Sequence, residues 1–380
     1  MELKLALGEC SGSFDMEKAV CNHGLFMMSP NVWIPSTKSL RRPLRLADSC
    51  RSVSVTISHP PDHPFLVIQV QDSLSSADEA AILEQVGRML RISSRDERCV
   101  REFQTMHSSA KEKGFGRIFR SPSFFEDAVK SLLLCNCGWK RTLDMARALC
   151  ELQPEIALVN GNANLKRKRS KQKPSSSKSS ECIQNFPSWK ELVAWTRINA
   201  TYLEKRCNLG YRAASILQLA TMFAQGKLVE DDITNIEQSS DPTAFETLYQ
   251  NLLEIRGFGP FVCSNIMMCV GFYRRIPSDT ETVRHLRQVH GKENCSIYTI
   301  AKDTVEIYGK YNPFQCLAYW CGQVMMSYLN NCRMELVEEY ESKSGKLSEL
   351  DAASYHLVTG SIFRDKGVKR IAYDAQRISY

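Results

Sequence analysis

The sequence predicts an α+β protein that is mostly helical, with an N-terminal antiparallel β-sheet followed by an all-helical domain. Apolar and polar residues alternate in the first 75 residues, as in half-buried strands. Beyond them, apolar residues recur at helical spacing. We expect a β-rich domain with one helix over 1–105, a helical domain over 106–335 carrying a disordered basic insert at 157–182, and a polar C-terminal tail over 336–380.

Composition indicates a folded protein without membrane spans. The chain has 380 residues, of which 43% are apolar and 24% charged, enough for two or three domains with full cores. No run of eighteen apolar residues occurs, and the N-terminus lacks the apolar stretch of a secretory signal. Residues 156–180 contain seven Lys or Arg and no acids, which accounts for the whole net charge of +7. Net charge therefore gives no argument that the folded body binds nucleic acid.

Three segments near the N-terminus have the pattern of strands. Ser52–Ser58 alternates Val and Ile with polar residues, and Phe65–Gln71 forms a second such run. The proline-rich stretch His59–Pro64 between them is a turn. We expect a third strand at Gly24–Met28.

Two capping boxes predict helix starts. Ser76-x-x-Glu79 precedes a helix that buries Ile82, Val86 and Met89. Ser123-x-x-Glu126 opens a helix whose apolar residues are Phe125, Val129, Leu132 and Leu133. That helix runs into a polar tip at 135–142, which contains Asn136 and Arg141. From these residues alone, the tip is the C-terminus of one helix followed by the next helix.

The later segments are again helical, with one interruption. Phe186–Phe223 has helical spacing, and Tyr211 stands where a new helix opens, a position typical of amphipathic packing. A buried helix is expected at Leu317–Leu329, with Trp320 and Gln323. The insert is too polar to fold by itself. Its basic run is Lys166, Arg167, Lys168 and Arg169, which fits a nuclear localisation signal, a DNA-binding arm or a solvated loop.

The most informative stretch is a predicted helical hairpin. Asp241 and Pro242 open a first helix, and Pro260 suits the first position of a second. Between the helices, Gly257 and Gly259 permit a tight turn whose backbone N–H groups point outward. Such a helix N-terminus can bind a phosphate, although an ordinary turn between two helices can have the same Gly-Phe-Gly sequence. Gly114-Phe115-Gly116 repeats those letters with no helical run leading into it.

A lone acid follows the hairpin. Asp279 comes twenty residues after Gly259 and two after Pro277. One helix and a return loop fill that distance, so the carboxylate can return to the region of the turn.

The whole stretch resembles the helix-hairpin-helix and Gly/Pro-Asp signature of base-excision DNA glycosylases, and the oxoguanine and alkylpurine branch in particular. The matching positions are Leu253, Ile255, Gly257, Phe258, Gly259, Asn265, Pro277 and Asp279. The resemblance implies that Asp279 is the catalytic acid residue. It also implies that the hairpin holds a DNA phosphate, often with a monovalent cation under the turn. The hairpin residues concerned are Gly257, Phe258, Gly259, Pro260 and Val262.

The same resemblance gives roles to other residues. Asn136 and Tyr211 match residues that wedge into the base stack, and Arg141 matches the arginine that reads the partner base. Cys137 and Gly138 stand where that family has Asn, so partner-base reading departs from the pattern. Phe261, Asn265, Trp320 and Gln323 are expected at the base pocket, with core packing as the alternative for the last two. The N-terminal strands resemble the family's sheet, and equally a generic antiparallel sheet.

One position separates two chemistries in the family. The oxoguanine branch has a nucleophilic Lys two residues after the last hairpin glycine, whereas this chain has Phe261. We therefore expect a monofunctional enzyme that uses water, requires no cofactor or metal, and acts as a nuclear monomer on double-stranded DNA with a damaged purine. None of the fifteen cysteines has zinc or iron–sulfur spacing, so we expect reduced thiols. The alternatives are a non-catalytic protein that binds distorted DNA and a helical scaffold that binds none.

Overall fold

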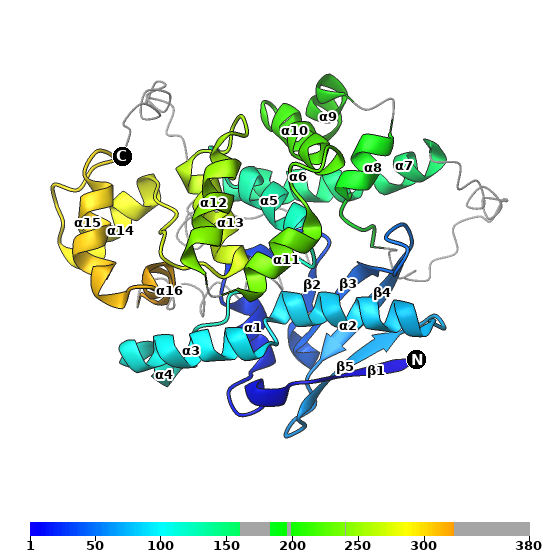
Figure 1. The fold of residues 1–380 in the computed structure, drawn as a ribbon, viewed down its shortest axis with the longest axis horizontal. Helices are drawn as coiled ribbons and strands as arrows, with labels where there is room; N and C mark the ends of the chain where they lie inside the picture. Colours follow the sequence, from blue (N-terminus) through cyan, green and yellow to red (C-terminus); the bar gives the residue numbers. More distant parts are fainter. Residues whose placement is uncertain (160–182, 196–198, 240, 323–380) are drawn as a thin grey trace.

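A computed structural model describes residues 1–159, 183–195, 199–239 and 241–322. The N-terminal region forms one sheet, seen in blue in Figure 1. Its strands are β1 (Glu2–Ala6), β2 (Val32–Ile34), β3 (Ser39–Arg45), β4 (Ser52–Ser58) and β5 (Phe65–Val70). They are ordered β1-β5-β4-β3-β2, and every neighbouring pair is antiparallel. The predicted combination of an antiparallel sheet with a larger number of helices is confirmed.

The predicted strands at Ser52–Ser58 and Phe65 onward are confirmed, whereas the one at Gly24–Met28 is wrong. Gly24–Met27 is a short 3-10 helix, η2. His23 caps it by accepting the N–H of Leu25 at 3.4 Å, and this local hydrogen bond favours a turn over an extended strand. Strands β1, β2 and β3 were not predicted.

The helices fill the rest of the described chain. From the N-terminus they are α1 (Met16–Cys21), α2 (Ser76–Leu90), α3 (Ser94–Met106), α4 (Ser108–Lys113), α5 (Phe124–Leu133), α6 (Trp139–Cys150), α7 (Gln153–Val159), α8 (Trp189–Ala194), α9 (Ala200–Cys207), α10 (Arg212–Ala224), α11 (Glu230–Gln238), α12 (Pro242–Leu253), α13 (Pro260–Val270), α14 (Thr280–His290), α15 (Ile300–Tyr308) and α16 (Gln315–Cys321).

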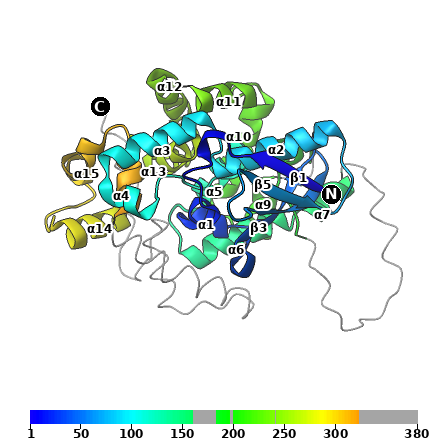
Figure 2. The ribbon, with the colours of Figure 1, turned by 90° about the horizontal axis from the view of Figure 1, so that it is seen from below.

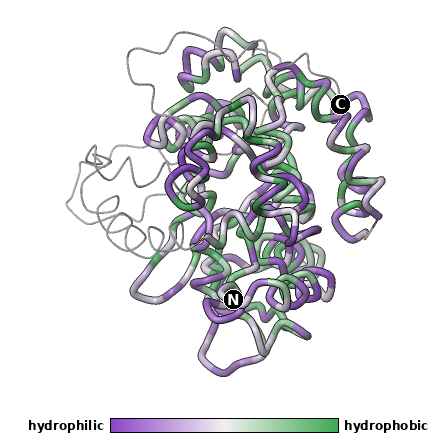
Figure 3. Tube along the Cα trace, turned by 90° about the vertical axis from the view of Figure 1, so that its left-hand side faces the viewer, coloured by the Kyte–Doolittle hydropathy of each residue, from purple (hydrophilic) through white to green (hydrophobic). Residues whose placement is uncertain are grey.

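Helix α2 packs against β1 and β3, while α14 and α15 lie at the end of the molecule away from the sheet (Figures 1 and 2). Hydrophobic and hydrophilic residues alternate along the helices, as expected where each buries one face (Figure 3). None of the helices in the described ranges is long and apolar enough to cross a membrane. The division at residues 105 and 335 stays a prediction.

Three predicted helix boundaries need correction. The capping box of α2 is Ser75 with Asp78, one residue before the predicted pair, because Asp78 also accepts the N–H of Ala47. Ser123 does cap α5, but the Glu126 carboxylate turns away to Arg42 and Lys130 and closes no box. The predicted helix Leu317–Leu329 corresponds in the described chain to α16, which begins at Gln315 and ends at Cys321, with Gly322 as its C-cap. Residues from 323 onward, including Gln323, lie outside the described chain.

One glycine pattern also differs from expectation. Cys135 and Cys137 lie in the turn after α5, within the predicted polar tip. The helix α4 does lead into Gly114-Phe115-Gly116, but no helix begins directly after it, so it is still not a hairpin. None of the thirteen cysteines in the described ranges forms a disulfide bond.

Helix α13 lies in the centre of the helical body. Every residue from Val262 to Val270 is buried, and the helix packs against α5 and α12. Three arginine–carbonyl hydrogen bonds of 2.9–3.0 Å hold its C-terminal end, from Arg91 to the carbonyls of Met268 and Cys269 and from Arg120 to Cys269. Cations at a helix C-terminus satisfy free carbonyls and complement the helix dipole. These contacts fix the direction in which the other end of α13 points.

Candidate active site

The predicted hairpin is present between α12 and α13. Asp241 caps α12 by accepting the N–H of Thr243 at 2.9 Å. The chain then reverses at Gly257, whose φ of +89° is a conformation that glycine adopts without strain. A Cβ atom at this position would lie 2.7 Å from Ser215 Oγ and 3.7 Å from the ring of Tyr211. Gly257 is therefore required both by the backbone conformation and by close packing against α10.

Backbone donors at the start of α13 are open. No side chain caps this helix, so the N–H groups of Gly259, Phe261 and Val262 have no intrahelical partner. Nothing lies within 4 Å of where a Cβ of Gly259 would be, which leaves the approach to these donors clear. Phe258 differs from its neighbours, because its side chain is buried and its N–H is bonded to Ile255 at 2.9 Å. It anchors the turn, while the groups around it face outward.

The predicted wedge residues gather beside this turn. Asn136 is exposed at the tip after α5, in a left-handed conformation with φ +51°, and its amide lies 3.4 Å from the hydroxyl of Tyr211. Tyr211 is 49% exposed although it immediately precedes α10. The exposed Arg141 donates to the carbonyl of Asn208 at 3.0 Å. Two segments separated by about seventy residues therefore present an amide, a phenol and a guanidinium on one surface.

Arg212 joins these two segments, and the sequence analysis gave it no role. Its buried guanidinium donates to the carbonyls of Leu132 and Cys135 at the end of α5 and to that of Leu209 before α10. It also lies 4.7 Å from the centre of the Tyr211 ring. The guanidinium of Arg212 is thus used for internal hydrogen bonds, which fix the position of the tip after α5 relative to Tyr211.

Asp279 is the N-cap of α14. Its Oδ1 accepts the N–H of Thr282 at 2.9 Å, and the hydroxyl of Thr282 returns to the N–H of Asp279 at 3.3 Å, which closes a capping box. The second carboxylate oxygen, Oδ2, is shielded from solvent and has no hydrogen-bond partner within the described chain. Asp279 forms no ion pair there either. One oxygen is anchored and the other is left for a ligand.

Burial raises the pKa of Asp279 from 3.8 to about 7, and the nearby Glu281 carboxylate adds to the rise, while hydrogen bonds from Thr282 oppose it. The charge of Asp279 reaches the Cys135 thiol, which is itself hydrogen-bonded to Tyr211. This electrostatic influence links Asp279 to the tip after α5, and Tyr211 contacts both that tip and the turn at Gly257. Buried carboxyl groups with strongly shifted pKa values and no ion-pair partner are typical of functional sites.

The residues expected at the base pocket are placed less distinctively. Phe261 is half-buried at the second position of α13. Asn265 is buried, and its amide donates to the carbonyl of Phe261 at 3.0 Å. Trp320 is buried with its ring 4.5 Å from that of His23. These contacts fit core packing as well as a pocket, so the pocket role stays a prediction.

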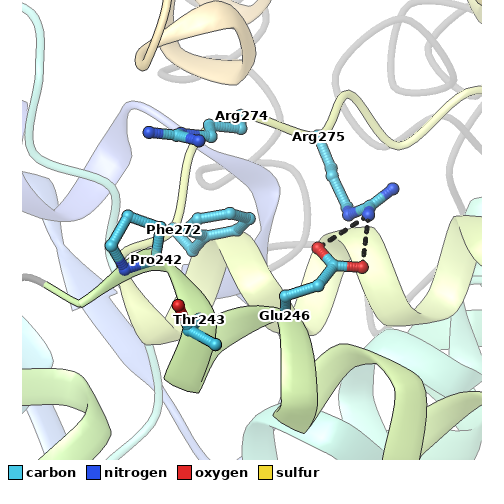
Figure 4. A pocket seen from close by; sticks show the side chains of 6 residues that line it. All are labelled: Pro242, Thr243, Glu246, Phe272, Arg274 and Arg275. Carbon is cyan, nitrogen blue, oxygen red and sulfur yellow. Dashed lines mark hydrogen bonds and ion pairs between the residues drawn. The ribbon is translucent and has the colours of Figure 1, made fainter.

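A shallow pocket of about 510 Å³ lies at the opposite end of the hairpin (Figure 4). It is lined by Pro242, Thr243, Glu246, Phe272, Arg274 and Arg275. The guanidinium of Arg275 is paired with Glu246 at 2.8 Å and lies 3.9 Å from the centre of the Tyr249 ring. Because the pocket borders the start of α12 and the end of α13, it is remote from Gly257 and Gly259, and we do not assign the active site to it.

Some of the predicted site residues lie outside the described chain, and some residues of the site were not predicted. Lys166–Arg169 and Gln323 lie outside the described residues. Within the described ranges, no group of three His, Cys, Asp or Glu could hold a metal ion. Thr282 and Ser215 were missed, although the Asp-x-x-Thr spacing at 279–282 is itself a capping signal that could have identified Thr282.

Three solved structures share this fold. The 3-methyladenine DNA glycosylase of Archaeoglobus fulgidus matches with a TM-score of 0.54 at 16% identity, over 84% of this chain and 98% of its own. The Clostridium acetobutylicum 8-oxoguanine glycosylase/lyase, in complex with dsDNA containing cytosine opposite 8-oxoG, matches with a TM-score of 0.54 at 14% identity, over 84% and 93%. Its apo form matches with a TM-score of 0.51 at 14% identity, over 79% and 93%.

No protein-family model matches the chain, and no curated protein sequence matches it. At identities of 14–16%, the structural likeness establishes the fold. The chain therefore has the fold of DNA glycosylases, and the activity must be argued from the site.

The two hairpin glycines should respond differently to substitution. Gly257→Ala forces a left-handed backbone on a residue with a Cβ that meets Ser215, and should reduce the free energy of unfolding by about 1–3 kcal/mol. Gly259→Ala places its Cβ in open space at φ −83° and should change stability by less than about 0.5 kcal/mol. Urea unfolding of both variants measures the difference. Equal losses of stability would contradict the geometry described for the turn.

Asp279 should destabilise the folded protein when it is ionised. Its pKa in the fold, about 7, exceeds the usual 3.8, so the cost is absent below pH 4, grows with rising pH, and is complete above pH 7. Asp279→Asn keeps the capping acceptor and removes this cost. Thermal or urea unfolding should find the variant more stable than wild type by about 1–3 kcal/mol at pH 8, with the difference vanishing near pH 4. A variant that is less stable at pH 8 would show that the carboxylate is not penalised by burial.

Proposed function

We propose that this protein is a monofunctional DNA N-glycosylase, which everts a damaged purine from double-stranded DNA and hydrolyses its glycosidic bond. The single observation that carries the proposal is the Asp279 carboxyl group, whose Oδ2 is shielded and unpaired. The same fold presents a glycine turn with open backbone donors at the start of α13. An ordinary helix cap has no reason to keep one carboxylate oxygen buried without a partner. The fold shared with glycosylases supports the same reading.

The DNA backbone would be held by the hairpin. The N–H groups at the start of α13 can donate to a phosphate, and the helix dipole favours an anion there. In Gly259 the absence of a side chain lets a sugar–phosphate strand approach closely. Asn136 and Tyr211 are the groups positioned to fill the space left by the extruded nucleotide, and Arg141 stands beside them to contact the partner strand.

Asp279 would perform the chemistry. Breaking the glycosidic bond leaves a sugar with oxocarbenium character, whose positive charge is stabilised by an ionised carboxylate at short range. Oδ2 can also accept a proton from the attacking water. Both tasks need the ionised form, so a pKa near 7 makes the reaction rate depend on pH in the physiological range.

Phe261 supports hydrolysis by water without a lyase step. The aromatic side chain occupies the second position of α13, where the resemblance would place a nucleophilic lysine, and none of the described lysines is hydrogen-bonded or ion-paired with Asp279. An aromatic ring here can stack on an electron-poor alkylated base, which fits alkylated as well as oxidised purines as substrates.

Three further properties belong to the proposal. The basic run Lys166–Arg169 would direct a monomeric enzyme to the nucleus for base-excision repair. A monovalent cation under the turn would be held by backbone carbonyls such as that of Arg256, which already accepts Ser215 Oγ at 2.5 Å. No catalytic step depends on that ion.

Asp279→Asn should abolish base release while leaving DNA binding intact. Duplexes that each carry one alkylated or oxidised purine are incubated with protein, and alkali reveals abasic sites. Since the carboxylate stabilises charge in the transition state, we expect a loss of at least about 100-fold in rate, with the dissociation constant for DNA changed less than about threefold. Asp241→Asn is the matched control, because it replaces another N-cap aspartate, remote from the site, and should keep the wild-type rate.

The same assays separate the alternatives. If wild-type protein binds damaged duplex but releases no base from any lesion, the protein is a non-catalytic DNA-binding protein. Gly259→Ala should then still weaken binding, because its Cβ obstructs the phosphate. If wild type binds no DNA even at low salt, where electrostatic binding is strongest, the hairpin is only structural.

Strand cleavage tests the monofunctional assignment. Wild-type protein should leave abasic sites that break only after alkali, and borohydride should trap no covalent protein–DNA complex, because trapping needs an amine–sugar Schiff base. A trapped complex would assign lyase activity to a lysine elsewhere in the chain.

A further inference from the structure

A hydrogen-bonded chain leads from α16 to the catalytic carboxyl. The hydroxyl of Tyr319 lies 3.1 Å from Thr282 Oγ1, which lies 3.2 Å from Asp279 Oδ1. Thr282 and Tyr319 are both buried, at 0% and 1% exposure. Three side chains from two helices are therefore joined in a region that excludes water.

The proton count gives this chain a direction. Thr282 Oγ1 accepts the N–H of Asp279 at 3.3 Å and has a single proton to donate. Tyr319 also has one proton, and Thr282 is the hydrogen-bond acceptor that the described residues offer it. The Thr282 hydroxyl has two acceptors within reach, Asp279 Oδ1 at 3.2 Å and the carbonyl oxygen of Pro277 at 3.4 Å. When Tyr319 donates to Thr282 and Thr282 donates to the nearer carboxylate oxygen, every hydroxyl proton has a partner. In that arrangement the hydrogen bonds polarise one another toward the carboxylate.

We propose that Thr282 and Tyr319 are positioning residues of the glycosylase, which anchor Asp279 through Oδ1 and thereby reserve Oδ2 for the everted nucleotide and its water. This inference rests on the proposed function for its meaning. A helix cap alone would be served by the backbone N–H of Thr282, which already donates to Oδ1 at 2.9 Å. The Thr282 hydroxyl also closes the capping box by accepting the N–H of Asp279, but its contact with Oδ1 and the phenol behind it are additional to the cap and bear on the ionised carboxylate.

Among the groups near Asp279, the hydrogen-bonded side chains of Thr282 and Tyr319 are the main ones that stabilise its negative charge. Glu281, on the same helix, repels it, and its own carboxylate is paired with Arg284 at 2.8 Å. Burial raises the pKa of the Cys135 thiol from the tip after α5 and that of the Tyr319 phenol on α16, so both are neutral near pH 7. No cation among the described residues offsets the burial of Asp279.

The sign of the effect follows from these contacts. Hydrogen bonds to an ionised carboxylate lower its pKa, so removing them raises it. Base release then needs a higher pH, and the acid side of the pH–rate profile moves upward. A residue that served only to stabilise the fold would change the unfolding midpoint without moving this profile.

Single-turnover base release from a duplex with one alkylated or oxidised purine, measured from pH 5 to 9, tests the proposal. Thr282→Val should move the acid midpoint upward by about one pH unit, and Tyr319→Phe by about half a unit. At one unit, the rate below the midpoint falls about tenfold and recovers near pH 9. Thr282→Ser, which keeps the hydroxyl, should retain the wild-type midpoint.

A double variant controls for folding. Thr282→Val leaves the Tyr319 hydroxyl buried without a partner, whereas Thr282→Val combined with Tyr319→Phe removes both polar groups and should recover stability. The double variant should still show the upward midpoint. If its midpoint returns to the wild-type value together with its stability, or if Thr282→Ser shifts as far as Thr282→Val, the positioning role is wrong.

Titration of the Asp279 carboxyl carbon by ¹³C NMR in the full chain, assigned with Asp279→Asn, separates this inference from the proposed activity. It should report the same upward shift in Thr282→Val without any substrate. An unchanged titration would overturn the positioning role even in an active enzyme. If the titration shifts but the protein releases no base, the proposed glycosylase activity is wrong, and the hydrogen-bonded chain from Tyr319 to Asp279 is retained.

Discussion

The structure depends on how helix α13 is held. Its residues from Val262 to Val270 are all buried, so its position is set by packing and not by solvent. At its C-terminus, Arg91 and Arg120 donate to the carbonyls of the last turn, and Asp96 and Glu237 neutralise these cations. The arginines come from α2 and from the segment before α5, so the N-terminal part of the chain determines where the hairpin points. A helix held at one end in this way presents the backbone donors of its other end in a fixed direction.

The candidate site makes use of the ordinary requirements of helix ends. α13 lacks a capping side chain, so its donors stay open for a ligand. α14 has a capping box, but its cap is a buried carboxyl of which only one oxygen is used. The uncapped start of α13 leaves backbone N–H groups without hydrogen bonds, and the cap of α14 leaves the charge of Asp279 poorly solvated. Both are costs to the folded state that a purely structural helix pair would avoid.

The sequence predicted the elements whose signals are local. The hairpin, its glycines, the helix that begins after Tyr211 and two of the strands follow from residue spacing and turn chemistry. Short strands such as β2 escaped prediction because three residues give no period, and their pairing with β3 is set by the tertiary fold. At Gly24–Met27 the apolar run is buried, and apolar content alone does not distinguish a strand from a buried turn. The box at Ser75 was displaced by one residue because a contact with Ala47, remote in sequence, decided which serine serves as the cap.

In the site, single residues were predictable and their mutual contacts were not. Asp279 could be identified from its place after Pro277, yet the burial that raises its pKa and the contact of its partner Thr282 with Tyr319 on α16 arise only in the folded chain. No sequence pattern gave Arg212 a role, and the fold buries it where it joins the α5 tip to Tyr211. A side chain that acts by holding others leaves no motif of its own, because its role is defined by the distances among its neighbours. The chemistry of this protein therefore resides in a few recognisable residues, and their competence to act resides in buried hydrogen bonds that only the folded chain creates.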